Sequence, residues 1–210
     1  MTDLWTYETE ARAAGFSLVC GVDEAGAGPL MGPVYAAAVI LPESCDLPGL
    51  NDSKKLTEKK REALFPLIQQ QALAWSVASV SAREIDDTDI LSARMKAMQL
   101  AIDGLPQKPD LALIDGNRDR GRCAAILTPH RCLIGGDGLS ASIAAASVLA
   151  KVSRDHYVTD VLDKEYPQYR FAQHKGYGTA LHYAMLDQYG PCPEHRLTFL
   201  KKWQQGREQP

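Results

Sequence analysis

The sequence contains few cysteines, and those present form no disulfide or metal-binding pattern. Its 210 residues include five, Cys20, Cys45, Cys123, Cys132 and Cys192, and no two of them form a Cys-x-x-Cys pair. An odd number of such cysteines indicates neither a disulfide framework nor a zinc site. They are typical of buried or half-buried thiols in a reducing compartment.

Long hydrophobic runs are also missing. The longest apolar segments, residues 34–41 and 141–150, are much shorter than the roughly 20 residues that a membrane-spanning helix requires. The N-terminal residues include acids and lack the apolar segment of a secretory signal. We therefore expect a cytoplasmic protein that binds no membrane.

The overall charge shows no excess of basic residues. The chain has 23 Lys and Arg against 26 Asp and Glu, a net charge of −3, which by itself argues against a nucleic-acid-binding protein. Basic residues nevertheless outnumber acids in residues 51–61 and 194–208. Each segment is compatible with an ordinary solvated surface or with a rim that binds a polyanion. Acids gathered at a metal site would hide such a rim in the total.

The pattern of apolar residues predicts strands early in the chain and helices late. Short segments rich in β-branched residues predict strands at residues 17–24, 34–41, 73–80 and 110–115, with further candidates at 123–128 and 130–136. Capping residues and helical spacing predict helices at residues 58–72, 82–103, 140–166 and 179–190. Thr57 is the expected cap of the first helix, which Pro66 should bend or interrupt. This order favours a mixed α/β fold with a helical C-terminal part.

Four acidic residues stand at the ends of apolar core segments. Asp23 and Glu24 end the first strand, Asp115 ends another, and Asp137 follows Gly135 and Gly136. Neighbouring side chains on a strand point to opposite faces, so Asp23 and Glu24 can share one site only if the backbone bends, which the glycines that follow permit. Brought together, the four acids would repel one another unless a divalent cation neutralised them. Oxygen ligands without His or Cys select Mg²⁺ or Mn²⁺.

Other interpretations of these residues remain open at this point. Each acid taken alone is also typical of a turn residue or a helix cap. The glycine-rich segment of residues 26–32 has the composition of a phosphate-binding loop, and would then belong to a nucleotide-binding phosphotransferase. It lacks the Gly-Lys-Ser/Thr and Gly-x-Gly-x-x-Gly patterns of such loops.

Several segments, taken in order, resemble the signature blocks of the bacterial ribonuclease HII family, a type 2 ribonuclease H. They are GVDEAGAGPLMGPV, NDSKKL, LIDGN, GGDGLSASIAAASVLAKVSRD, YPQY, FAQHKGYGT and GPCPEHR. The resemblance implies a ribonuclease H-like fold, a mixed sheet flanked by helices with a helical C-terminal segment. We expect a catalytic core over residues 1–165, loosely ordered before residue 17. Residues 166–210 would form a helical segment that packs on the core and contributes to substrate binding.

The resemblance also implies an activity. The family hydrolyses the RNA strand of RNA/DNA hybrids and nicks duplex DNA 5′ to embedded ribonucleotides, by two-metal-ion catalysis that leaves 5′-phosphate and 3′-hydroxyl ends. The implied cofactors are two Mg²⁺ or Mn²⁺ ions, and the implied partner is a hybrid or a ribonucleotide-containing duplex. We expect a monomer that interacts with replication or repair machinery.

Site residues follow from the resemblance position by position. The family's metal-binding carboxylates correspond to Asp23, Glu24, Asp115 and Asp137. Excluding these four acids changes the net charge from −3 to +1. Tyr177 matches the tyrosine that stacks on the sugar at the RNA-to-DNA junction. The matching substrate contacts are Gly26, Ala27 and Gly28 at the 2′-OH, and Asn51, Ser53, Lys54, Ser147 and Lys151 at the phosphates.

One departure from the family affects the predicted activity. The family has a Gly-Arg-Gly motif where this chain has Gly26, Ala27 and Gly28, and it often has Lys where Gly135 stands. A charge-assisted phosphate contact contributes about 1.5–3 kcal/mol, so roughly 10- to 150-fold in binding or rate would be lost. The alternative function is therefore a hybrid-binding protein with attenuated or lost catalysis. Arg118 and Arg122 are candidates to supply the missing cation.

Overall fold

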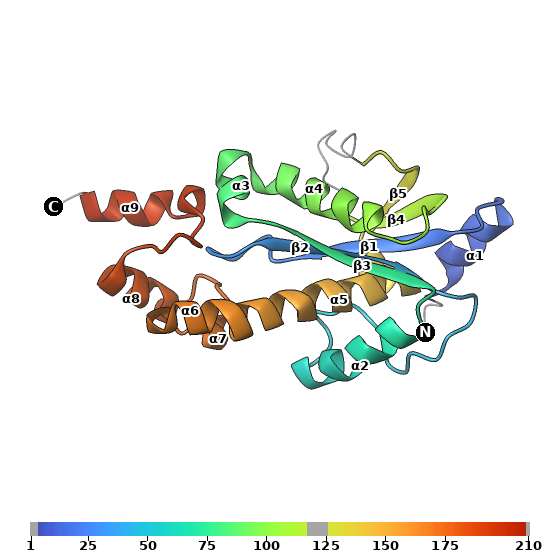
Figure 1. Cartoon of the computed structure of the whole chain (residues 1–210), viewed down its shortest axis with the longest axis horizontal. Coiled ribbons are helices and arrows are strands. Elements are labelled where there is room, and N and C mark those ends of the chain that lie inside the picture. Colours follow the sequence, from blue (N-terminus) through green and yellow to red (C-terminus); the bar gives the residue numbers. More distant parts are fainter. Residues whose placement is uncertain (1–3, 117–125, 209–210) are drawn as a thin grey trace.

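A computed structural model describes residues 4–116 and 126–208, which build one mixed β-sheet between two layers of helices (Figure 1). The five-stranded sheet has the order β3-β2-β1-β4-β5. Its strands are β1 (Val19–Ala25), β2 (Val34–Ile40), β3 (Ala74–Val80), β4 (Leu111–Asp115) and β5 (His130–Leu133). The predicted mixed sheet is therefore confirmed, including the strand in residues 130–136. Residues 126–128 form no strand, and residues 123–125 of that candidate lie outside the described residues.

The directions of the strands decide where the acids meet. β1 pairs antiparallel with β2, which pairs antiparallel with β3. β1 pairs parallel with β4, and β4 pairs parallel with β5. Parallel neighbours have their carboxyl ends at the same edge of a sheet. Residues that end β1 and β4 therefore lie near each other although they are far apart in the sequence.

One face of the sheet packs against helices α3 (Ala82–Asp87) and α4 (Ile90–Asp103). Cys20 and Val22 of β1 point to this face and form a core with the buried apolar residues of α4. The side chain of Ser81 accepts from the backbone N–H of Glu84, and α4 ends before Gly104, as expected. The helix expected over residues 82–103 is divided in two, because the side chain of Asp89 accepts from the N–H groups of Leu91 and Ser92 and begins α4 anew. The alternating apolar residues of the strands and the apolar stripe of α4 therefore form two surfaces that pack against each other.

The other face of the sheet packs against α5 (Ala141–Tyr157), with α2 (Glu58–Gln71) beyond it (Figure 1). Gly21 of β1 lets α5 approach the sheet closely, because a Cβ at this position would lie 2.1 Å from the backbone carbon of Ser142. Thr57 caps α2 as expected, but the helix runs through Pro66 without interruption. Proline removes one hydrogen bond, and the burial of Leu64 and Ile68 on either side holds the helix together.

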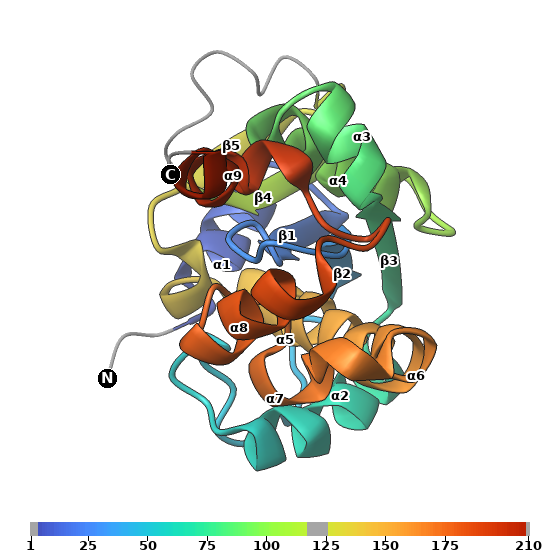
Figure 2. The same ribbon diagram turned by 90° about the vertical axis from the view of Figure 1, so that its left-hand side faces the viewer.

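Beyond α5 the chain continues as short helices that gather at one end of the molecule (Figure 2). The long helix predicted up to Pro167 consists of α5, a π-helical turn η3 (Val158–Leu162) and α6 (Asp163–Glu165). It is followed by η4 (Pro167–Tyr169), α7 (Phe171–His174), α8 (Ala180–Tyr189), η5 (Leu197–Phe199) and α9 (Lys201–Glu208). Thr179 caps α8 and Gly190 ends it, as expected from the sequence. These helices surround the connection between β1 and β2.

The N-terminal helix α1 (Thr6–Ala13) is tied to the start of α5. The carboxylate of Glu8 is 1% exposed and accepts from the hydroxyl of Ser140 at 2.5 Å and from the backbone N–H of Ser142 at 2.9 Å.

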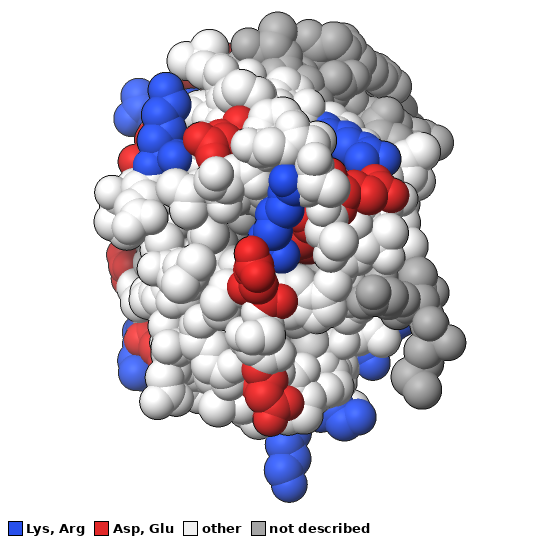
Figure 3. All heavy atoms as spheres, turned by 90° about the vertical axis from the view of Figure 1, so that its right-hand side faces the viewer, with Lys and Arg blue, Asp and Glu red and all other residues white. Residues whose placement is uncertain are grey.

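At the end of the molecule that carries α1, basic and acidic side chains lie side by side on the surface (Figure 3). Among the described residues, no helix is both long and apolar enough to cross a bilayer.

Candidate active site

Three of the predicted carboxylates come together at one edge of the sheet. One oxygen from each of Asp23, Asp115 and Asp137 lies within 4.8 Å of the others. Asp23 lies on β1, Asp115 ends β4, and Asp137 lies in the 3₁₀ turn η2 (Gly136–Gly138) that follows β5. The backbone N–H of Gly136 donates to Oδ1 of Asp115 at 2.7 Å, which fixes that turn against β4. The parallel strands therefore assemble acids that the sequence separates by more than 90 residues.

Glu24 lies beside this cluster but points to the opposite face of the sheet. β1 keeps its regular pairing up to Ala25, so the strand does not bend at these acids. Oε1 of Glu24 accepts from Nη2 of Arg94 on α4 at 2.5 Å. Its other oxygen, Oε2, is buried and has no hydrogen-bond partner within residues 4–116 and 126–208. The structure thus brings three of the predicted acids together and places the fourth next to them.

The cluster is electrostatically unfavourable without a cation. Burial, and then the charges of Glu24 and Asp115, raises the pKa of Asp23 well above its ordinary value. Burial and repulsion by Asp115 raise the pKa of Asp137 to about 6. Burial also raises the pKa of Glu24, although Arg94 opposes it. A divalent cation with oxygen ligands would remove this repulsion, so the residues fit a cation site.

The loop of residues 51–55 places a lysine at the edge of the cluster. Nζ of Lys54 lies 3.7 Å from Oδ2 of Asp137. Burial acts to lower the pKa of Lys54, but the charges of Asp23 and Asp137 raise it overall. The buried Asp52, which sequence analysis did not single out, accepts from the backbone N–H of Lys54 at 2.8 Å. Asp52 therefore shapes the loop that carries the lysine.

The connection between β1 and β2, residues 26–33, forms a turn beside Tyr177 and is called the glycine turn below. Gly26 and Gly32 have φ of 92° and 74°, a region that favours glycine. Ala27 is half-buried and Gly28 is exposed. A Cβ added to Gly28 would lie 3.9 Å from Cε1 of Tyr177, whose side chain is 44% exposed. The structure therefore brings the predicted glycine turn and the predicted tyrosine together.

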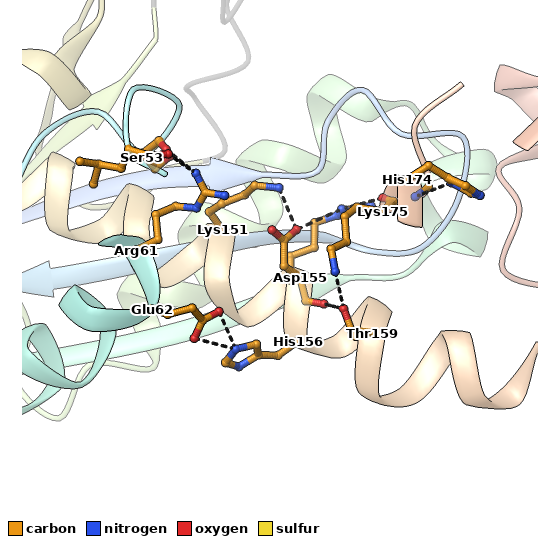
Figure 4. Close-up of polar contacts among 12 residues, drawn as sticks. Ser53, Arg61, Glu62, Lys151, Asp155, His156, Thr159, His174 and Lys175 are labelled. Carbon is orange, nitrogen blue, oxygen red and sulfur yellow. Dashed lines mark hydrogen bonds and ion pairs between the residues drawn. The ribbon is translucent and has the colours of Figure 1, made fainter. Parts of the chain in front are cut away.

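The remaining predicted contacts differ in exposure. Asn51 and Lys54 are exposed, whereas Ser53 and Ser147 are buried and joined by a hydrogen bond of 3.3 Å from the Ser53 N–H to Oγ of Ser147. Figure 4 shows Lys151 on α5 beside Asp155, with Nζ 2.7 Å from Oδ1. The same Nζ lies 5.9 Å from the centre of the Tyr177 ring. The two serines hold the loop against α5, while Lys151 borders the tyrosine.

Three arginines around the site were not among the residues predicted from the sequence. Arg94 holds Glu24, and Arg154 and Arg196 lie fully buried under the glycine turn. Each had a signal in the sequence. Arg94 interrupts an apolar helical pattern, and the other two stand within the blocks AKVSRD and GPCPEHR. Arg118 and Arg122, the candidates for a replacement cation, lie outside the described residues.

The fold and the site together define the class of this protein. A mixed sheet flanked by helices, with carboxylates at the ends of its adjacent central strands, is the ribonuclease H-like arrangement that the sequence predicted. The sequence profile of Ribonuclease HII matches residues 20–205. The chain belongs to the ribonuclease HII family, and so to the nucleases of the ribonuclease H type.

Individual relatives agree with this assignment. The chain is 46% identical over 201 residues to a ribonuclease HII of Acetivibrio thermocellus, covering 96% of this chain and 77% of the relative. It is 52% identical over 185 residues to a ribonuclease HII of Vibrio parahaemolyticus, covering 88% of this chain and 85% of the relative. The crystal structure of ribonuclease H2 from Pyrococcus horikoshii is similar in fold, with a TM-score of 0.75 and 25% identity. That match covers 92% of this chain and 100% of the other.

Proposed function

We propose that this chain is a metal-dependent endoribonuclease that hydrolyses the RNA strand of RNA/DNA hybrids and nicks duplex DNA 5′ to embedded ribonucleotides. The observation that carries the proposal is the convergence of Asp23, Asp115 and Asp137 within 4.8 Å. Membership of the ribonuclease HII family supports it. The expected products have 5′-phosphate and 3′-hydroxyl ends.

The carboxylates are the groups that would hold the cofactor. Asp23, Asp115 and Asp137 offer hard oxygen ligands, and the unpartnered Oε2 of Glu24 is available beside them. Such a donor set suits Mg²⁺ or Mn²⁺. Two bound ions would lower the pKa of the attacking water and stabilise the charge that develops on the leaving 3′ oxygen. The chain's own task is to fix the carboxylates, which it does through β1, β4 and the turn after β5.

Substrate recognition belongs to the surface between the glycine turn and Tyr177. Gly26 follows Asp23 by three residues, about 10 Å along a strand, so a nucleotide can contact the turn while its phosphate reaches the carboxylates. The backbone N–H groups of the turn would hydrogen-bond the 2′-OH that separates RNA from DNA. The exposed ring of Tyr177 would stack on the adjoining sugar. Lys54 and Lys151 would contact phosphates on either side.

A second candidate function follows from Ala27. A chain that binds hybrids through the same surface, but lacks the guanidinium that holds the phosphate, would cleave them slowly or not at all. The convergence of the carboxylates argues against a complete loss of catalysis, since binding alone requires no such cluster.

Hydrolysis of a labelled RNA/DNA hybrid tests the proposal. We expect cleavage of the RNA strand in Mg²⁺ or Mn²⁺ and none in EDTA. Asp115→Asn keeps an oxygen that can accept from the N–H of Gly136. Because it removes one negatively charged metal ligand, it should reduce cleavage about 100-fold or more. Asp160→Asn, at an exposed position on the π-helical turn, is the matched control. Binding of the hybrid without metal-dependent cleavage would favour the second candidate.

A further inference from the structure

Every N–H donor of the Arg196 side chain is hydrogen-bonded to the glycine turn. A guanidinium has five N–H donors, and the side chain of Arg196 is 0% exposed. Its Nε donates to the carbonyl of Gly32, and Nη1 donates to those of Ala27 and Pro29. Nη2 donates to the carbonyls of Gly26 and Gly32, both at 2.7 Å. All of these acceptors are backbone carbonyls of one turn, so the side chain acts as an internal clamp.

The clamp determines where the N–H groups of the turn point. In a planar trans peptide the C=O of one residue and the N–H of the next point in opposite directions. The carbonyls of Gly26 and Ala27 point at Arg196, so the N–H groups of Ala27 and Gly28 point away from it. Among the described residues neither N–H group has a hydrogen-bond acceptor.

A third peptide of the turn illustrates the same rule. The carbonyl of Pro29 accepts from Arg196 at 2.9 Å, and the N–H of Leu30 on the other side of that peptide donates to the carbonyl of Gly176 at 2.9 Å. Gly176 precedes Tyr177. The peptide between Pro29 and Leu30 therefore connects the clamp to the segment that carries the tyrosine.

The C-terminal segment that carries Arg196 is itself fixed to the turn. The N–H of Arg196 donates to the carbonyl of Leu30, and the N–H of Gly32 donates to the carbonyl of Glu194. Met31 and His195 form an isolated antiparallel β-bridge between these two pairs. Arg196 thus enters the turn from a short strand-like pairing, which leaves its side chain little freedom to move.

A second buried arginine supports the turn from α5. A Cβ added to Gly26 would lie 2.2 Å from Nε of Arg154, so the backbone rests directly on this side chain. Arg154 donates to the carbonyls of Met31 and Lys175 at 3.3 and 3.1 Å. It makes no hydrogen bond to the carbonyl of Gly26 or of Ala27, so Arg196 alone orients these two peptides among the described residues.

We propose that Arg196 is a positioning residue that presets the N–H groups of Ala27 and Gly28 to recognise a ribose 2′-OH, and so determines the preference for RNA over DNA. The inference rests on the proposed function. It deepens that function by assigning the specificity to a residue that touches no substrate. The planar fork of an arginine is required, because a lysine ammonium cannot reach four carbonyls at once.

The test compares the binding of two short duplexes of the same sequence, an RNA/DNA hybrid and a DNA duplex, both fluorescently labelled and both in EDTA. Arg196→Lys and Arg196→Met are the variants, and Arg83→Met, at a side chain that is 90% exposed, is the control. Fluorescence anisotropy gives each affinity, and circular dichroism melts report the fold. We expect the ratio of hybrid to DNA affinity to fall at least about five-fold in both variants, with the control unchanged.

Several outcomes would overturn the inference. An unchanged ratio in the folded variants, or an equal loss of affinity for both duplexes, would mean that Arg196 does not set specificity. A wild-type ratio in Arg196→Lys would assign the effect to charge rather than to the fork. Unfolding of both variants would make Arg196 a residue of the general core. If the natural chain neither prefers nor cleaves the hybrid, the proposed function itself fails, which is a separate result.

Discussion

Arg94 of α4 and Glu24 of β1 form an ion pair, with Nη2 of Arg94 2.5 Å from Oε1 of Glu24. Their side chains are 21% and 12% exposed, so little water screens the pair. Arg94 belongs to α4, on the face of the sheet opposite α5. It offsets one negative charge of the four carboxylates from the α4 side of the sheet. Oε2 of Glu24 has no hydrogen-bond partner in the described part of the chain.

Removing Arg94 should destabilise the metal-free protein. In Arg94→Met the Glu24 carboxylate remains buried without a cation, and we expect a loss of about 1–3 kcal/mol in the free energy of unfolding. Mn²⁺ should restore more stability to this variant than to the natural chain, because one competing positive charge is gone. Thermal melts in EDTA and in Mn²⁺ measure both effects, with Arg83→Met as the control. Equal melting temperatures in EDTA would refute the role of the pair.

Two buried histidines predict a loss of stability in acid. Nε2 of His182 and Nε2 of His195 lie 3.0 Å apart. The N–H of Cys192 donates to Nδ1 of His195, so the ring proton of His195 is on Nε2. This Nε2–H donates to Nε2 of His182. The ring proton of His182 is then on Nδ1, which donates to the carbonyl of Tyr177. Both rings are neutral in this chain of bonds. Burial lowers the pKa of each to about 4, and the nearby imidazole of His174 acts in the same direction.

The sign of the effect follows from the pKa values. Between the ordinary value near 6.5 and about 4 the unfolded chain binds protons that the folded chain excludes. The contribution of these two histidines to stability is therefore complete above pH 6.5 and falls as the pH drops to 4, by up to about 1.4 kcal/mol per pH unit for each histidine. Denaturant unfolding of the natural chain and of His195→Gln across this range isolates the contribution. A variant as acid-sensitive as the natural chain would contradict it.

Substitutions of Tyr177 should separate stacking from hydrogen bonding. Tyr177→Phe keeps the ring and should retain most cleavage activity, whereas Tyr177→Ala should lose about 5- to 150-fold, since stacking on an aromatic contributes about 1–3 kcal/mol. The side chain is 44% exposed, so neither change should alter the melting temperature much. Initial rates on a labelled hybrid measure the difference. Equal rates for the two variants would show that the ring does not contact substrate.

The sheet and the convergence of acids were predictable because they depend on local patterns. Apolar strands ending in Asp23 and Asp115 predict a shared edge once the strands are parallel, and helix caps such as Ser81 are local as well. The course of α2 through Pro66 was not predictable, because packing on either side outweighs one lost hydrogen bond.

The contacts of the three buried or half-buried arginines could not be predicted from the sequence, although their positions stood out in it. Arg196 is separated from the glycine turn by more than 160 residues, and its acceptors are carbonyls, which carry no signal in the sequence. The placement of Glu24 against Arg94 likewise depends on which helix covers that face of the sheet. Long-range contacts between a side chain and the backbone appear only when the fold is known.

Restoring the family arginine should increase activity. In Ala27→Arg a guanidinium at this half-buried position would hold a substrate phosphate, and we expect kcat/KM to rise about 10- to 150-fold. Ala27→Met adds a side chain without charge and should give no such gain. Steady-state cleavage of a hybrid by the three proteins measures the effect. A similar increase in both variants would attribute it to bulk rather than to charge.

The most direct measurement is the cleavage of duplex DNA that contains a single ribonucleotide, with the position and ends of the nick analysed. With Mg²⁺ or Mn²⁺ the natural chain should cut 5′ to the ribonucleotide, leaving a 3′-hydroxyl and a 5′-phosphate, and EDTA should abolish the cut. The absence of any metal-dependent nick, under conditions in which Ala27→Arg does cut, would contradict the account of this chain as an active ribonuclease.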